Sequence, residues 1–124
     1  MNMVDSSGWL EYFTNGPNAE RFFPPLKDTA SLMVPVVSIY EVFKVVLRES
    51  GENAALQAAM AMQKATVAEM TPQLAMAAAK ISLELSLPMA DSMILATARH
   101  HHATIWTQDA HFRTIPGVKY FAKA

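Results

Sequence analysis

Four acidic side chains are the residues of this 124-residue chain best suited to chemistry: Asp5, Glu41, Asp91 and Asp109. Three of the chain's four aspartates are among them, each at the expected end of a strand or start of a helix. Carboxylates that share a site repel one another and raise one another's pKa, so such a cluster requires a cation. Hard oxygen ligands without thiolates favour Mg²⁺ or Mn²⁺ over Zn²⁺. The pattern therefore predicts a Mg²⁺ or Mn²⁺ site.

The elements that must position these carboxylates alternate between strands and helices. Short apolar or β-branched runs predict strands at residues 3–4, 32–34, 66–68, 103–107 and 118–121. Helical patterns fill the segments between most of them, and strands separated in this way pair in parallel with helices on both faces. We expect an α/β fold with a small central parallel sheet flanked by helices, in a single domain spanning residues 1–124.

Local signals place several helix boundaries. Ser6 is an N-cap candidate for the first helix, and Ser38-x-x-Glu41 has the form of a capping box that opens a helix ending at Gly51. Thr71 followed by Pro72 predicts a helix that runs to about residue 85. A further helix is expected to start at Asp91 and to close in the histidine run at residues 100–102.

Each carboxylate also has an ordinary structural interpretation. Asp5 could cap a helix, Asp91 could complement a helix dipole, and Asp109 could form a turn. The capping box accounts for Glu41 without any metal, which makes Glu41 the weakest of the four when taken alone. In parallel sheets, however, sites form at the carboxyl ends of the strands. All four acids are therefore expected to converge on one edge of the sheet.

The segments that carry these acids resemble the four motifs of PIN domains. They are residues 4–7, 38–42, 90–98 and 107–112. Their order and spacing most resemble the VapC toxins of bacterial toxin–antitoxin pairs, and the resemblance covers essentially the whole chain. It implies a metal-dependent endoribonuclease that hydrolyses RNA phosphodiester bonds as a toxin. It also implies a cognate antitoxin that blocks the site, and commonly a homodimer.

The resemblance also suggests roles for individual residues. The acidic quartet of the family, which is catalytic and binds the metal, corresponds to Asp5, Glu41, Asp91 and Asp109. Ser6 and Thr107 correspond to hydroxyl positions that hold the carboxylates or water. Lys44, on the same helix as Glu41, is placed to pair with an RNA phosphate. Arg48 lies four residues further along this face and has a solvated role as its ordinary interpretation.

Bulk composition restricts the remaining possibilities. The formal charge is −1, so a polyanion must be held by local basic residues or bound cations. With 52% hydrophobic and 17% charged residues, the chain is not a disordered or highly charged tail protein. No cysteine is present, which suits a reducing cytoplasm, and no targeting segment is visible. We expect a cytoplasmic protein without a membrane contact.

Rival functional classes fit the sequence less well. A PIN-like binding module without nuclease activity is the main alternative, and an intact acidic quartet argues against it. Receiver domains and Asp-x-Asp phosphatases require paired acids after the first strand, but residue 7 is serine. Adjacent helical side chains point about 100° apart, so the three histidines at residues 100–102 cannot share one metal ion in regular geometry. The run is therefore interpreted as surface. His111 is interpreted as an exposed loop residue.

Two apolar helix faces remain open in their role. One is formed by Leu56, Met60 and Met62, and the other by Met76 and Leu83. Either face could contact a second copy of the chain or the antitoxin, although burial in the core is the more usual role. Trp9 and Trp106 are expected in the core beside the first and fourth strands.

Overall fold

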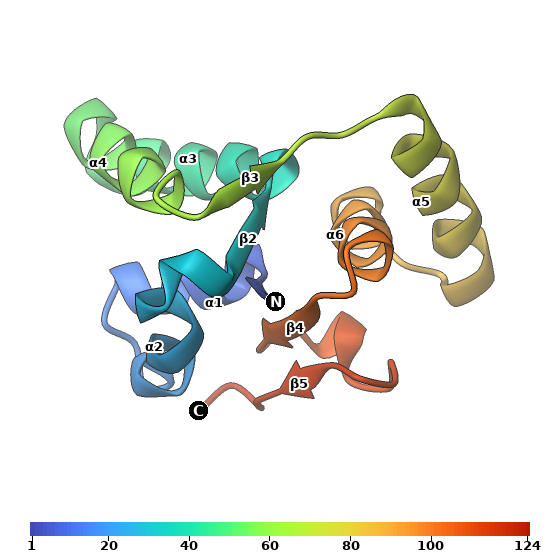
Figure 1. Cartoon of the computed structure of the whole chain (residues 1–124). Coiled ribbons are helices and arrows are strands. Elements are labelled where there is room, and N and C mark those ends of the chain that lie inside the picture. The colour runs from blue at the N-terminus through green and yellow to red at the C-terminus, as the bar shows by residue number, and fades with distance from the viewer.

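A five-stranded parallel sheet with the strand order β3-β2-β1-β4-β5 forms the centre of the computed structural model, which describes residues 1–124 (Figure 1). The strands are β1 (Asn2–Val4), β2 (Leu32–Pro35), β3 (Thr66–Ala68), β4 (Thr104–Thr107) and β5 (Lys119–Tyr120). The helices are α1 (Ser6–Phe13), α2 (Ala19–Lys27), α3 (Val36–Ser50), α4 (Glu52–Met62), α5 (Pro72–Leu85) and α6 (Met89–His100). Two 3-10 turns, η1 (Thr29–Ser31) and η2 (Ala110–Phe112), complete the chain. The predicted fold class is confirmed.

Alternation along the central strands divides the core into two layers, because successive side chains of a strand point to opposite faces of the sheet. Met3 and Met33 pack with buried residues of α5 and α6, such as Ile81 and Ile94. Val4 joins the second layer, in which residues of α1, α2, α3 and α4 are buried. Figure 1 shows α5 and α6 on one side of the sheet and the first four helices on the other.

The order of the strands fixes where a site can form. From β1 the chain first builds β2 and β3 on one side, then returns to add β4 and β5 on the other. The neighbours β1 and β4 therefore flank a topological switch point, where open α/β sheets bind ligands beyond the carboxyl ends of their strands. Asp5 directly follows β1, and Asp109 comes two residues after β4.

Three predicted helix starts are wrong by one to three residues. Helix α3 begins at Val36, so Ser38 lies inside the helix and its buried hydroxyl has no hydrogen-bond partner. The expected capping box therefore does not form. Asp5, not Ser6, caps α1 by accepting a hydrogen bond from the Gly8 backbone N–H at 3.0 Å. Helix α6 begins at Met89, which places Asp91 in its first turn.

The two apolar helix faces are largely exposed, which corrects the expectation of core burial. Of the residues in question only Met62 is buried, and these side chains lie at the surface: Leu56, Met60, Met76 and Leu83. Trp9 is buried as predicted, whereas Trp106 is half-buried and donates a hydrogen bond from Nε1 to Asn2.

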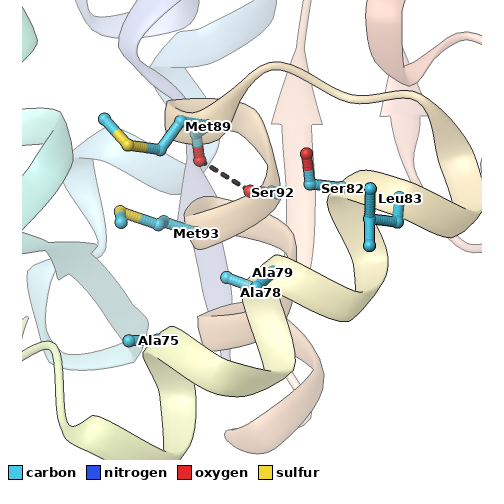
Figure 2. A pocket seen from close by; sticks show the side chains of 8 residues that line it. All are labelled: Ala75, Ala78, Ala79, Ser82, Leu83, Met89, Ser92 and Met93. Atoms are coloured by element: carbon cyan, nitrogen blue, oxygen red, sulfur yellow. Dashed lines mark hydrogen bonds between the residues drawn. The ribbon is translucent and has the colours of Figure 1, made fainter.

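A hollow of about 460 Å³ lies between α5 and α6, and six of the eight residues that line it are hydrophobic (Figure 2). Figure 2 shows Leu83 on α5 and Met89 and Met93 on α6 around this hollow. None of the helices has the length and apolar composition of a membrane span. The pair α5 and α6, which are bent by 116° relative to each other, meets these two criteria only when the helices are taken together.

Candidate metal centre

Asp5 is the most deeply buried of the four acids, with 2% of its surface exposed. Its position at the junction of β1 and α1 follows from its role as the N-cap. The carboxylate accepts hydrogen bonds from the Gly8 backbone N–H, from the Ser7 hydroxyl at 2.7 Å and from the Thr107 hydroxyl at 2.6 Å. These three donors hold Asp5 in one orientation.

Thr107 links the first strand to the fourth. Its fully buried hydroxyl donates to Asp5 Oδ2 and accepts a hydrogen bond from the Asp109 backbone N–H at 2.9 Å. The Ser7 hydroxyl accepts from the Gln108 backbone N–H at 3.2 Å, which ties the start of α1 to the same loop. The ends of β1 and β4 are thus held together by hydroxyl groups beside two carboxylates.

Glu41 reaches the site from α3 and is held by Ser6. The Ser6 hydroxyl donates to Glu41 Oε1 at 2.6 Å, across 35 residues of sequence. Glu41 is also one of the charges that raise the pKa of Asp91, so the two side chains lie in the same electrostatic environment. Since the capping box does not form, the local structural explanation of Glu41 does not apply.

Asp91, Asp109 and His111 form the tightest group of metal-ligating side chains. One ligand atom from each lies within 4.8 Å of the other two. His111 Nδ1 is 2.7 Å from Asp91 Oδ2 and 3.2 Å from Asp109 Oδ1. His111 is exposed as expected, with 55% of its side chain accessible, but its Nδ1 also faces both carboxylates, which the sequence did not indicate.

The acids destabilise one another's ionised forms. Burial, opposed by the three hydrogen bonds and reinforced by the charge of Asp109, raises the pKa of Asp5 to about 7. Burial and the Asp109 charge likewise raise the pKa of Asp91, against the lowering effect of His111. The pKa of His111 is raised by its hydrogen bond to Asp91 and by the charge of Asp109. The site therefore concentrates negative charge that only one half-exposed histidine offsets.

This donor set fits a hard divalent cation. Carboxylates directly after β1, on α3, on α6 and in the β4–η2 loop offer oxygen atoms as ligands, and no thiolate is present in the chain. A divalent cation would stabilise the ionised forms of Asp5 and Asp91, which burial and, in addition, the charge of Asp109 disfavour. Mg²⁺, Ca²⁺ and Mn²⁺ all suit such ligands.

Basic side chains near the acids are few. Lys44, three residues after Glu41 on α3, is exposed, and its Nζ lies 5.7 Å from the centre of the Tyr40 ring. Arg48 pairs with the adjacent Glu49 at 3.1 Å in a solvent-exposed contact, as its solvated interpretation predicted. Arg99 on α6 lines a small hollow that it shares with His111.

Two residues of the site escaped prediction. Ser7 was not singled out, although it follows Asp5 and Ser6 in a run of polar residues at the end of β1. His111 was noticed but set aside. Its spacing of two residues from Asp109 was the available signal, because η2 turns the chain back so that the His111 backbone N–H donates to Asp109 Oδ1 at 2.9 Å.

Solved structures with the same fold include several toxins and toxin–antitoxin complexes. A toxin–antitoxin complex from Klebsiella pneumoniae is 20% identical, with a TM-score of 0.80 and 95% of each chain covered. VapC20 of Mycobacterium tuberculosis, a toxin that cleaves the sarcin–ricin loop, is 18% identical, with a TM-score of 0.81 and coverage of 96% of this chain and 98% of that one. A DNA-bound VapBC complex from Salmonella typhimurium is 19% identical, with a TM-score of 0.74 and 98% of each chain covered.

The sequence comparisons address the family directly. Curated protein sequences include no match to this chain. The sequence profile of the PIN domain, in contrast, matches residues 3–118, which includes all four acids and every strand except the last. The chain therefore belongs to the PIN domain family.

Proposed function

We propose that this protein is a Mg²⁺- or Mn²⁺-dependent endoribonuclease that acts as the toxin of a toxin–antitoxin pair. The observation that carries the proposal is the meeting of four carboxylates from separate elements at the switch point of the sheet. Membership of the PIN domain family and the shared fold with a toxin that cleaves the sarcin–ricin loop support this reaction.

In this proposal Asp5, Asp91 and Asp109 hold the divalent ion, and Glu41 binds a second ion or orients the attacking water. Ser6 fixes Glu41, and Thr107 fixes Asp5 relative to the Asp109 backbone. A bound divalent ion would lower the pKa of a water molecule that it coordinates and would stabilise negative charge on a phosphate. Lys44 provides a point charge for the RNA backbone near Glu41.

A cleavage assay with a matched pair of variants tests the proposal. Asp91→Asn keeps the size of the side chain but removes a ligand charge, so we expect cleavage of RNA to fall at least about a hundredfold. Asp28→Asn, at an exposed aspartate outside the cluster, should cleave as the wild type does. EDTA should abolish cleavage, and added Mg²⁺ or Mn²⁺ should restore it. Full activity of folded Asp91→Asn, or activity that survives EDTA, would overturn the proposal.

We further propose a cognate antitoxin that blocks this site, and a homodimer. The fold shared with DNA-bound VapBC supports the antitoxin. In the proposed homodimer the two copies contact each other through the α5–α6 face around the hollow of Figure 2, where Leu83 and Met89 are 87% and 69% exposed. Apolar side chains gathered on one face are typical of a protein contact. Co-purification with the neighbouring gene product tests the antitoxin, and light scattering tests the dimer.

A further inference from the structure

We infer that His111 is a direct nitrogen ligand of the metal ion, and that it makes the site prefer Mn²⁺ to Mg²⁺. The inference rests on the proposed function and adds a fifth ligand to the acidic quartet. It concerns which ion the site takes, a property that four carboxylates alone leave open because both ions accept oxygen ligands.

The distances around His111 Nδ1 match those between neighbouring ligands of one ion. In an octahedral site with bonds of about 2.1 Å, adjacent ligand atoms lie about 3.0 Å apart. The separations of Nδ1 from Asp91 Oδ2 and from Asp109 Oδ1, 2.7 and 3.2 Å, bracket this value. Without an ion the shorter contact is a hydrogen bond, and Nδ1 gives up any proton it carries there when it binds the metal. The same nitrogen thus faces oxygens of two different carboxylates, as a shared ion requires.

The backbone around His111 holds the ring in this place. Asp109 caps η2, and its Oδ1 accepts the His111 backbone N–H at 2.9 Å. The next residue, Phe112, is fully buried in the core layer beneath α5 and α6, which anchors the turn. The ring therefore points at the carboxylates because the fold fixes its backbone on both sides, while its half-exposed position leaves the ion open to substrate.

Ligand chemistry gives the expected preference. Mg²⁺ takes oxygen ligands and keeps much of its water, whereas imidazole nitrogen suits first-row transition ions. Removal of a supporting group around a metal costs about 10–100-fold in affinity, and loss of a direct ligand costs at least as much. We expect His111→Ala to weaken Mn²⁺ binding about tenfold or more, while Mg²⁺ binding changes by less than about threefold because the imidazole contributes little to it.

Electron spin-echo envelope modulation of the Mn²⁺-loaded protein reads this contact without reference to activity. The wild type should show nitrogen-14 modulation from a coordinated imidazole. His111→Ala and His111→Asn should lose it, the second variant because an amide can donate to Asp91 but offers no ring nitrogen to a metal. The matched control is His100→Ala, which removes an exposed histidine at the end of α6 and should keep the signal.

The outcomes separate this inference from the function on which it rests. One result would overturn the role of His111 and leave the carboxylate site standing: the wild type binds Mn²⁺ without nitrogen modulation, and Asp91→Asn no longer binds the ion. Equal or tighter Mn²⁺ binding by His111→Ala would overturn it as well. If calorimetry detects neither Mn²⁺ nor Mg²⁺ on the wild type, the proposed function fails together with the inference.

Discussion

The buried carboxylate of Asp5 makes the stability of the metal-free protein depend on pH. Folded Asp5 keeps its proton up to about pH 7, whereas the unfolded chain releases it near the ordinary pKa of 3.8. Between these values the folded state binds more protons, so the free energy of unfolding falls as pH rises and its loss is complete above pH 7. A difference of one in pKa corresponds to about 1.4 kcal/mol, so the free energy of unfolding changes by about 4 kcal/mol over this range of pH.

Asp5→Asn isolates this effect, because asparagine has nearly the same shape as aspartate but does not titrate. Urea unfolding in EDTA at pH 4 and pH 8 should show the wild type losing about 4 kcal/mol more than the variant does. This corresponds to a relative fall in melting temperature on the order of 15 °C. Asp28→Asn serves as the control, and it should follow the wild-type curve.

Divalent metal should reverse the effect in the wild type alone. Binding to the ionised carboxylate stabilises the folded state, by about 2.7 kcal/mol at a hundred times the dissociation constant. Mn²⁺ at pH 8 should therefore raise the melting temperature of the wild type far more than that of Asp5→Asn. Parallel pH curves for the two proteins in EDTA would refute the account of Asp5 as a buried, repelled carboxylate.

Three further perturbations follow from contacts described above. Thr107→Val leaves Asp5 Oδ2 and the Asp109 backbone N–H without a partner, so it should lower stability by about 2–4 kcal/mol in urea unfolding, and Thr107→Ser should restore most of it. Gly8→Ala places a Cβ 2.5 Å from Val4 Cγ1, a clash that should cost about 1–3 kcal/mol by the same assay, while Gly51→Ala meets no neighbour and leaves packing intact despite its strained backbone. Leu83→Glu should convert the proposed dimer to a monomer in light scattering without loss of RNA cleavage; a dimer that persists would exclude this face.

The sequence predicted the fold well where the signal is local. Thr71 and Pro72 mark the start of α5, and that helix runs over the predicted residues to Leu85. Short β-branched runs gave all five strands to within two residues, because alternation with helices leaves parallel pairing as the main solution.

Local reasoning failed at α3, where the Ser38-x-x-Glu41 pattern suggested a cap. Helix α3 starts directly after the extended Pro35 that ends β2, three residues too early for Ser38 to act as the cap. Glu41 instead bonds Ser6 at the start of α1, a contact across 35 residues that no local spacing encodes.

The site shows the same division between local and distant contacts. Asp5, Asp91 and Asp109 keep their ordinary roles as cap, first-turn acid and turn former, and the charge of Asp109 also acts on the other two carboxylates. An aspartate can therefore cap a helix or form a turn and also belong to the candidate metal site. A structural role for one of these acids does not argue against a role in metal binding. The contact of His111 with Asp91 spans 20 residues and depends on how η2 sits against α6, so the sequence alone did not reveal it.

The central position of β1 has a consequence for synthesis on the ribosome. The strand that precedes Asp5 is made before its partner β4, and the hydrogen bond that joins Thr107 to Asp5 spans 102 residues. A nascent chain can fold α1 to α4 against β1 and β2, yet Asp91 and Asp109 arrive only with the last third of the chain. The carboxylate cluster therefore cannot assemble until the segment that follows α5 has been made.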